Sequence, residues 1–237
     1  MHKPVDLAIH YWGTPVVLIS TVNEDGSTNV APMSSVWWLG WSCMLGLDAS
    51  SQTVVNLRRQ GQCVVNLCAG HNADLVNRLA LLTGRKSVPI HKKALGYRYE
   101  ANKIDAAGIT EQSSEEVLPP RVLQCPVQLE ATVVSISPFA TKDPRMAIAA
   151  CAIELKIVRT HVAEELLTGT KLDRINTDMW RPLLMSFRHL FKMGERELES
   201  RLDSGPEHAY APWKGGATMA IAGKILRGWS NARYGEK

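Results

Sequence analysis

The first third of the chain is divided into short apolar blocks, which are typical of β-strands rather than helices. A β-branched and apolar run covers residues 15–22, and the Asp25-Gly26 pair that follows suits a tight hairpin. A second strand is expected at 28–31, bending or ending at Pro32, because proline cannot donate to a sheet ladder. The pattern therefore predicts a β-hairpin near the N-terminus.

A third apolar block covers residues 36–47 and is expected to be a strand. It contains Gly40 and Gly46, where a bulge or a close approach of another backbone would fit. Three strands this near to one another in sequence predict an antiparallel meander.

The spacing of apolar residues then changes to a helical one. A short helix is expected at 51–60, preceded by hydroxyl caps and ending at Gly61. A strand follows at 62–69. Leucines at helical spacing next predict a second helix, with Asn72 as its N-cap and Gly84 as its end.

The remaining pattern contains one long gap. Residues 85–121 are polar and irregular, and a loop of this length inside a domain is more often functional than not. Two strong strands are expected at 127–137 and 147–162, and a helix near Pro182. The apolar face predicted for that helix consists of Leu183, Leu184, Phe187, Leu190 and Phe191.

About six mainly sequential strands with three or four helices predict a mainly β fold, a small antiparallel β-barrel with peripheral helices. A doubly wound parallel sheet is disfavoured because strands and helices do not alternate. The length of 237 residues suits a main domain over 1–205, followed by a basic and apolar tail over 206–237.

Composition narrows the classes of partner. Hydrophobic residues make up 45% of the chain and charged residues 21%, which is ordinary globular composition. A net charge of +4 suits a small anionic ligand. The first 200 residues contain no dense stripe of Lys and Arg of the kind that would predict nucleic-acid binding. No apolar run predicts a membrane span or a signal peptide, and five cysteines without a metal-binding spacing favour free thiols in the cytoplasm.

The sequence lacks the usual catalytic motifs. It contains no G-x-S-x-G, no H-E-x-x-H and no Walker A motif, and no G-x-G-x-x-G follows a predicted strand. Lone acids such as Asp48 and Glu130 have no obvious partners in the sequence. An enzyme of this kind usually takes its chemistry from a cofactor.

Two segments are candidates for binding such a cofactor. In DASSQTVVN the hydroxyls of Ser50, Ser51 and Thr53 precede and open a helix, whose free N–H groups can hold a phosphate. Plain N-capping explains the same residues equally simply. In NVAPMSSVWWLGW, three tryptophans follow two serines. They could cover a flavin, or they could be residues of the core or of a subunit interface.

Taken together in their order, several segments resemble a known family. They are PVVLISTVNEDGSTNVAPMSS, SSQTVVNLRRQGQCVVNL, AGIT, PPRV and CPVQLEATV. The chain resembles the flavin reductase-like, FMN-binding split-barrel family over about residues 12–170. The branch that it resembles contains flavoredoxins and the reductase component of nitrilotriacetate monooxygenase.

The resemblance implies an FMN site. Asn29–Ser34 would lie along the flavin ring, and Thr53, which opens the helix, would bind the phosphate. The complete set of cofactor-binding residues that it implies is Pro32, Met33, Ser34, Ser35, Val36, Trp37, Leu47, Asp48, Ser50, Ser51, Thr53 and Asn56.

One departure from the family pattern concerns the phosphate. Many members have a lysine immediately before the threonine, whereas this chain has Gln52. Arg58, Arg59 or Arg85 could supply the missing charge, and the sequence does not choose among them.

The resemblance also implies a reaction. NAD(P)H would stack on the flavin and transfer hydride to it, and no acid or base of the protein is required. Tyr97, Arg98, Tyr99 and Lys103 in the long loop could fold over the nicotinamide, or they could form a solvated loop.

The expected function is an NAD(P)H-dependent flavin reductase that supplies reduced FMN to a separate monooxygenase. The alternatives are an enzyme that retains FMN and acts on an organic substrate, and a non-catalytic flavin binder. A homodimer is implied, and the helix expected after Pro182 could be an interface element or could pack on its own barrel. For the tail, contact with a partner subunit or with the site is favoured over a membrane surface or nucleic acid.

Overall fold

The computed structural model describes residues 1–169, 174–204 and 224–225. The chain divides into two units, 1–196 and 197–237, each described here by itself. In the second unit the described element is the 3-10 helix η3 (Arg201–Ser204). The predicted boundary at residue 205 remains a prediction, and most of the predicted tail lies outside the described residues. No helix in the described part of the chain is long and apolar enough to cross a membrane.

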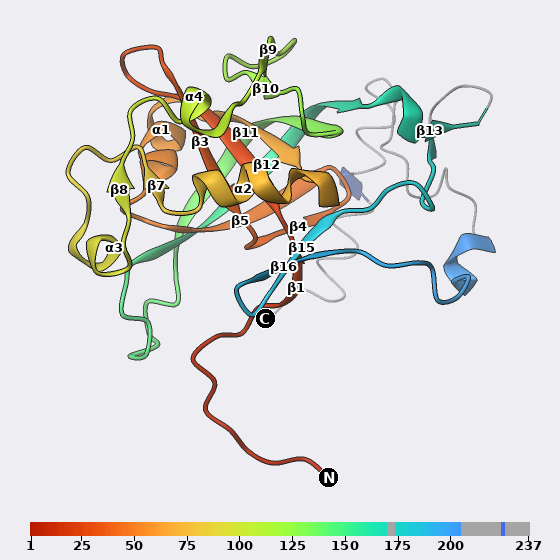
Figure 1. Cartoon of the computed structure of the whole chain (residues 1–237), viewed down its shortest axis with the longest axis horizontal. Helices are drawn as coiled ribbons and strands as arrows, with labels where there is room; N and C mark the ends of the chain where they lie inside the picture. The colour runs from red at the N-terminus through yellow and green to blue at the C-terminus, as the bar shows by residue number, and fades with distance from the viewer. Residues whose placement is uncertain (170–173, 205–223, 226–237) are drawn as a thin grey trace. The chain divides into compact units, whose positions relative to one another are not determined.

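The first unit is built on one seven-stranded sheet in which every neighbouring pair is antiparallel, with the order β3-β2-β6-β11-β12-β5-β4. This confirms the predicted mainly β antiparallel fold (Figure 1). The strands are β2 (Val17–Val22), β3 (Thr28–Met33), β4 (Val36–Leu39), β5 (Ser42–Asp48), β6 (Gln62–Leu67), β11 (Val127–Phe139) and β12 (Ala150–Val162).

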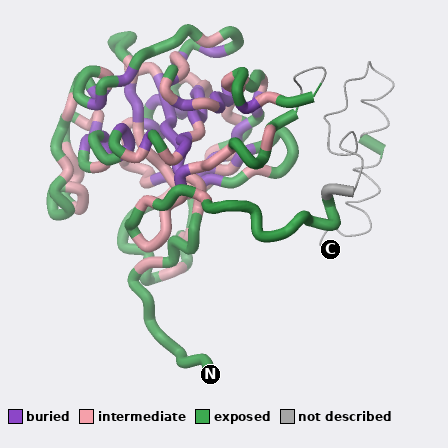
Figure 2. The backbone as a smooth tube through the Cα atoms, turned by 45° about the vertical axis from the view of Figure 1, so that its right-hand side comes forward, coloured by how far each residue is buried: buried purple, intermediate pink, exposed green. Residues whose placement is uncertain are grey.

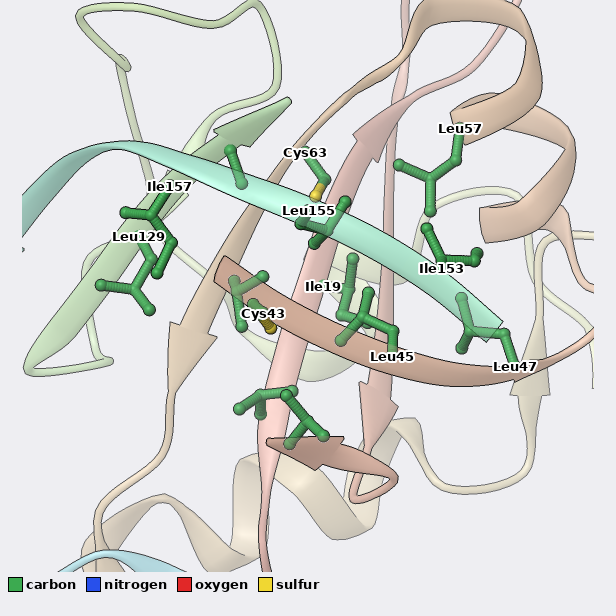
Figure 3. Packing of buried hydrophobic residues seen from close by; sticks show 14 of the residues in the cluster. Ile19, Cys43, Leu45, Leu47, Leu57, Cys63, Leu129, Ile153, Leu155 and Ile157 are labelled. Carbon is green, nitrogen blue, oxygen red and sulfur yellow. The ribbon is translucent and has the colours of Figure 1, made fainter. Parts of the chain in front are cut away.

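Strand β2 is buried on both faces, which explains the consecutive apolar residues at its start, Val17–Ile19. Because side chains alternate across a strand, Val17 and Ile19 enter one apolar cluster while Leu18 enters another. Figure 3 shows the first cluster, in which Ile153 and Leu155 of β12 point toward β2 and β5. Figure 2 shows that the buried residues gather in the interior of this unit.

The second cluster lies between the other face of β2 and two helices. It joins Leu18 to Leu79 of α2 (Ala73–Leu79) and to Ala107 of α4 (Lys103–Ala107). These helices thereby cover one face of the β2–β3 hairpin, which would otherwise be exposed to solvent.

Two details of the predicted meander need correction. The strand that should bend or end at Pro32 continues to Met33, because β3 is an edge strand and the missing donor there breaks no ladder bond. The single block 36–47 is two strands, β4 and β5, joined by a turn at Gly40, whose φ is +59°. The close approach predicted at Gly46 is confirmed, because its amide donates to the carbonyl of Ser35 at 2.8 Å.

The first predicted helix is α1 (Gln52–Gln60), with Ser51 as N-cap and Gly61 as a left-handed C-cap. The second helix is shorter than predicted. It follows the 3-10 helix η1 (Gly70–Asn72) and ends at Leu79, because the next residues form β7 (Leu82–Thr83) instead of a further turn.

The long polar segment is less irregular than expected. It contains α3 (Ile90–Ala94), β8 (Arg98–Tyr99), α4, β9 (Glu111–Gln112) and β10 (Arg121–Val122). Strands β7 and β8 form a two-residue parallel pair, and β9 and β10 form an antiparallel pair. The segment is therefore a series of small anchored elements.

The predicted helix after Pro182 is wrong, because residues 183–192 form a hairpin of β15 (Leu183–Ser186) and β16 (His189–Lys192). Phe187 and Arg188 make its turn with φ of +47° and +75°. Leu184 faces Phe191 across the hairpin. Apolar residues that pair across two short strands thus had the same spacing along the sequence as one face of a helix. Strand β15 also pairs with β1 (Trp12–Pro15).

Three short elements complete the unit. They are η2 (Glu164–Leu166), β13 (Leu167–Thr168) and β14 (Arg174–Ile175).

Candidate functional site

A cavity of about 250 Å³ lies where the start of α1, strand β3, the end of β5 and the segment from β7 to α4 meet. Figure 1 shows α1, α3, β7 and β8 gathered on one side of the sheet. Six of the twelve residues predicted to bind the cofactor line this cavity: Pro32, Met33, Leu47, Asp48, Ser51 and Thr53.

The other six predicted residues are not among those that line it. Ser50 lies beside the cavity and donates its hydroxyl proton to Asp48 at 2.6 Å. Asn56 is buried below it, where its amide donates to Thr21 and Asn23 and supports the β2–β3 hairpin. These contacts explain why a polar residue one turn from Thr53 is needed even without a ligand.

The remaining predicted residues, Ser34, Ser35, Val36 and Trp37, continue from β3 into β4. Ser35 shares a hydrogen bond of 2.9 Å with the hydroxyl of Tyr11, and Val36 packs in the apolar core. Trp37 is 56% exposed.

The other two tryptophans of this stretch differ from each other. Trp38 packs partly against the core, whereas Trp41 is exposed. The tryptophans of this stretch therefore do not form a single buried cluster.

The start of α1 leaves two backbone amides without an acceptor in the described part of the chain. Ser51 caps the amide of Val54 at 3.2 Å, but the amides of Gln52 and Thr53 have no acceptor within the described part of the chain. The hydroxyl of Thr53 accepts from Asn29 at 3.2 Å and keeps its own proton free to donate. Free amides at a helix N-terminus, with the positive end of the helix dipole, favour a negatively charged group.

Gln52 does not replace the lysine that many family members have at this place. Its side-chain amide donates to Asn56 at 2.9 Å and is held along the helix. Arg58 and Arg59 contact Cys151 and the carbonyl of Val22, away from the cavity.

Lys103 is the cation that the sequence did not place here. Its side chain is only 3% exposed, lines the cavity, and donates to Asn29 Oδ1 at 3.1 Å and to the carbonyl of Val30 at 3.0 Å. No carboxylate among the described residues forms an ion pair with it. Of the two alternatives left open by the sequence, the solvated loop is therefore wrong for Lys103.

The charge of Lys103 is costly where it lies. Burial, and to a smaller extent the charge of Lys92, lowers its pKa to about 8, while Glu100 acts in the opposite direction. The ammonium is still mainly protonated at pH 7. A buried cation whose contacts are neutral oxygens retains the capacity to bind an anion.

The site also contains one carboxylate, that of Asp48, and it contacts two basic side chains. Asp48 Oδ2 lies 2.8 Å from His91 Nε2 and 3.1 Å from Lys92 Nζ, and Ser50 donates twice to Oδ1. Burial alone would raise the pKa of Asp48. Hydrogen bonds from Ser50 and His91, together with the nearby ammonium, instead lower it to about 2.

Gly84 brings another backbone segment against the start of α1. A Cβ at this position would lie 2.6 Å from Asn29 Oδ1 and 3.1 Å from Gln52 Cγ. A glycine is therefore required for the close approach, and helix start, β3 and the segment after β7 form one packed unit.

The sequence contained a partial signal for this arrangement. The Ser-Ser-x-Thr cap before a helix predicted the helix start that lines the cavity, and Gly84 was expected as a helix end and not as a packing glycine. Lys103 and the pair of Asp48 with His91 had no such signal, because their partners are 43 to 74 positions away in sequence.

Comparison with known proteins gives one consistent result. A family model described as "Flavin reductase like domain" matches residues 9–194. The uncharacterized protein YdfE of Bacillus subtilis (strain 168) is 36% identical over 192 residues, which is 81% of this chain and 89% of YdfE.

Solved structures agree in fold. Nitrilotriacetate monooxygenase component B from Bacillus cereus matches with a TM-score of 0.62 at 20% identity, over 78% of this chain and 86% of that protein. Flavoredoxin of Desulfovibrio vulgaris (Miyazaki F) matches with a TM-score of 0.69 at 15% identity, over 87% of this chain and all of that protein. The expected split-barrel fold is thereby confirmed.

Proposed function

Because the chain belongs to the flavin reductase-like domain family, we propose that it binds FMN in the cavity at the start of α1 and reduces it with NAD(P)H. The observation that supports this most directly is that two free helix amides and the buried ammonium of Lys103 belong to residues lining the same cavity. Bound FMN would supply the redox chemistry that the side chains of the protein lack.

The phosphate of FMN suits this part of the cavity. The amides of Gln52 and Thr53 would donate to its oxygens, and Lys103 would take the place of the lysine missing at position 52. Each such contact to a charged group is worth about 1.5 to 3 kcal/mol. Because Lys92 pairs with Asp48 and offsets its charge, the carboxylate does not oppose the phosphate with a full charge.

The flavin ring would lie along the backbone of 31–36, starting from Pro32 and Met33, which line the cavity. Small side chains at Ser34 and Ser35 would allow the backbone to approach the ring. Trp37, which is exposed, would flank its outer edge. The protein would thus orient the ring and exclude water from one face, and NAD(P)H would approach the other.

The reaction is tested by anaerobic stopped-flow mixing of the FMN-loaded protein with NADH and, separately, with NADPH. Loss of the oxidised flavin absorbance within seconds is the expected result, and the faster donor names the preferred nucleotide. An absorbance that stays unchanged with both donors would contradict the proposed reaction and leave FMN binding standing.

Flavin retention distinguishes a reductase that supplies a monooxygenase from an enzyme that keeps FMN. We expect reduced FMN to leave the protein readily, because a supplying reductase must release its product. Flavin retained through gel filtration, together with slow NAD(P)H oxidation, would instead favour direct action on an organic substrate.

The proposed homodimer is supported by large apolar side chains exposed on an edge strand. Strand β4 ends the sheet and exposes Trp37 and Leu39, the latter by 77%, and Trp12 on β1 is also exposed. Such an edge favours pairing with a second copy of the chain. Replacement of Leu39 by lysine should convert a dimer into a monomer in light scattering, and a monomeric wild-type protein would contradict the proposal.

A further inference from the structure

Residues 84–97, here called the strap, leave the body of the protein and return to it at almost the same place. The strap begins after β7 and ends at β8, and these two strands pair with Leu82 opposite Arg98 and Thr83 opposite Tyr99. Arg98 also donates its amide to Leu81 at 3.0 Å. Both ends of the strap are therefore fixed side by side, while its middle extends beyond them (Figure 1).

Apolar burial does not hold the middle of the strap. Its helix α3 contains no buried residue. The large apolar side chains of Ile90, the first residue of α3, and of Leu95, which follows the helix, are 86% and 68% exposed. A segment with so little buried surface opens at a small cost in free energy unless other contacts secure it.

Those contacts converge on a single carboxylate. His91 and Lys92 on α3 lie 2.8 and 3.1 Å from Asp48 Oδ2, and Asp48 is the last residue of β5. Ser50 holds the other oxygen with its amide and hydroxyl, at 2.7 and 2.6 Å. The carboxylate is thus fixed to the sheet and acts as a latch for the strap.

The strap lines the cavity beside the helix start at which the phosphate would bind. His91, Lys92 and Tyr97 line the same cavity as Thr53 and Lys103. At the root of the strap, Gly84 packs directly against the start of α1.

FMN ends at its phosphate, whereas in FAD a second phosphate and an adenosine continue from that point. A ligand that continues past the helix start would meet the strap. The strap is therefore placed to separate the two flavins by length.

We propose that the strap, latched through Asp48, makes the site selective for a flavin mononucleotide over a flavin dinucleotide. This inference rests on the proposed function, since it concerns the same cavity. FMN is accommodated with the strap closed, but FAD requires the contacts of His91 and Lys92 with Asp48 to break. Asp48, His91 and Lys92 are then residues that determine specificity through the position of the strap.

The test compares dissociation constants for FMN and FAD, measured by flavin fluorescence, in the wild-type protein, Asp48→Asn and His91→Gln/Lys92→Met. Because both flavins contain the same ring and first phosphate, any effect of a variant on the binding of these groups cancels in the ratio of the two dissociation constants. We expect at least a 30-fold preference for FMN in the wild-type protein and at least a five-fold smaller preference in both variants. Lys93→Met removes the same charge as Lys92→Met from an exposed neighbour and should leave the ratio unchanged.

Hydrogen exchange of the strap amides gives a second readout, without flavin. Exchange in residues 85–97 should be faster in Asp48→Asn and His91→Gln/Lys92→Met than in the wild-type protein and Lys93→Met. A wild-type protein that binds FAD as tightly as FMN, or variants whose ratio and exchange both stay at the wild-type values, would overturn the inference. A wild-type protein that binds neither flavin would instead remove the proposed function itself.

Discussion

The cavity has two sides, and they are held in place by different forces. On one side the start of α1 and strand β3 are fixed by buried groups, with Asn29, Thr53 and Lys103 joined in one hydrogen-bonded chain. On the other side the strap is exposed and is held by ion pairs to Asp48. The buried side can position a ligand accurately, and the latched side can move without unfolding the sheet.

The difference has a consequence for how each side is perturbed. Changes on the buried side should alter affinity and global stability, because they remove groups that cannot be replaced by water. Changes on the strap should alter local exchange and ligand choice.

Replacing Lys103 by methionine should have the largest effect on binding. Loss of the ammonium removes a contact to the phosphate worth about 2 kcal/mol, so FMN affinity should fall about 30-fold. Riboflavin, which has no phosphate, should bind the variant and the wild-type protein equally well. Lys93→Met, an equal change of charge on the exposed strap, serves as the control. A parallel loss for both flavins would show that Lys103 acts only through the fold.

Replacing Gly84 by alanine should destabilise the buried side. Its Cβ would overlap Asn29 Oδ1 at 2.6 Å, and relief of such overpacking typically costs about 1 to 3 kcal/mol of unfolding free energy. Urea denaturation measures this cost. Gly194→Ala, where an added Cβ would contact nothing within 4 Å, is the matched control. Equal midpoints for the two variants would show that the helix start adjusts freely.

The latch should weaken in acid. The pKa of Asp48 is about 2 in the folded protein, below its ordinary value of 3.8, so its stabilising contribution is present above pH 4 and lost as the pH falls toward 2. Between pH 6 and pH 2.5 the wild-type protein should lose about 1 to 2 kcal/mol more than Asp48→Asn. An identical loss of unfolding free energy in both proteins would contradict the latch.

Replacing Ser51 by alanine should have the smallest effect. The hydroxyl that caps the amide of Val54 at 3.2 Å is lost, and such a cap is worth about 1 kcal/mol. The thermal midpoint should fall by a few degrees, and FMN should bind slightly more weakly because the helix start frays. Ser87→Ala, at an exposed serine outside α1, provides the reference. A midpoint for Ser51→Ala that equals this reference would show that the cap is dispensable.

Local sequence was sufficient where the structure depends on neighbouring residues. Ser51 and Gly61 defined the ends of α1 because caps act within one turn of the helix. Apolar runs located the sheet strands because each strand has at least one buried face.

Local sequence did not predict the structure where contacting residues are far apart in the sequence, or where a helix and a hairpin give the same spacing of apolar residues. The block 183–192 has apolar residues that suit one face of a helix, yet a turn at Phe187 and Arg188 makes it a hairpin paired with β1. Lys103 enters the cavity because α4 packs on the second apolar cluster, which no pattern around Lys103 reveals.

The most direct test of the account is a comparison of FMN and riboflavin binding to the wild-type protein by isothermal titration. The two ligands share the ring and differ in the phosphate assigned to the start of α1 and Lys103. We expect FMN to bind at least about 100-fold more tightly than riboflavin, which is equivalent to about 2.7 kcal/mol of binding free energy. Equal affinities would show that no phosphate site exists there and would contradict the central claim.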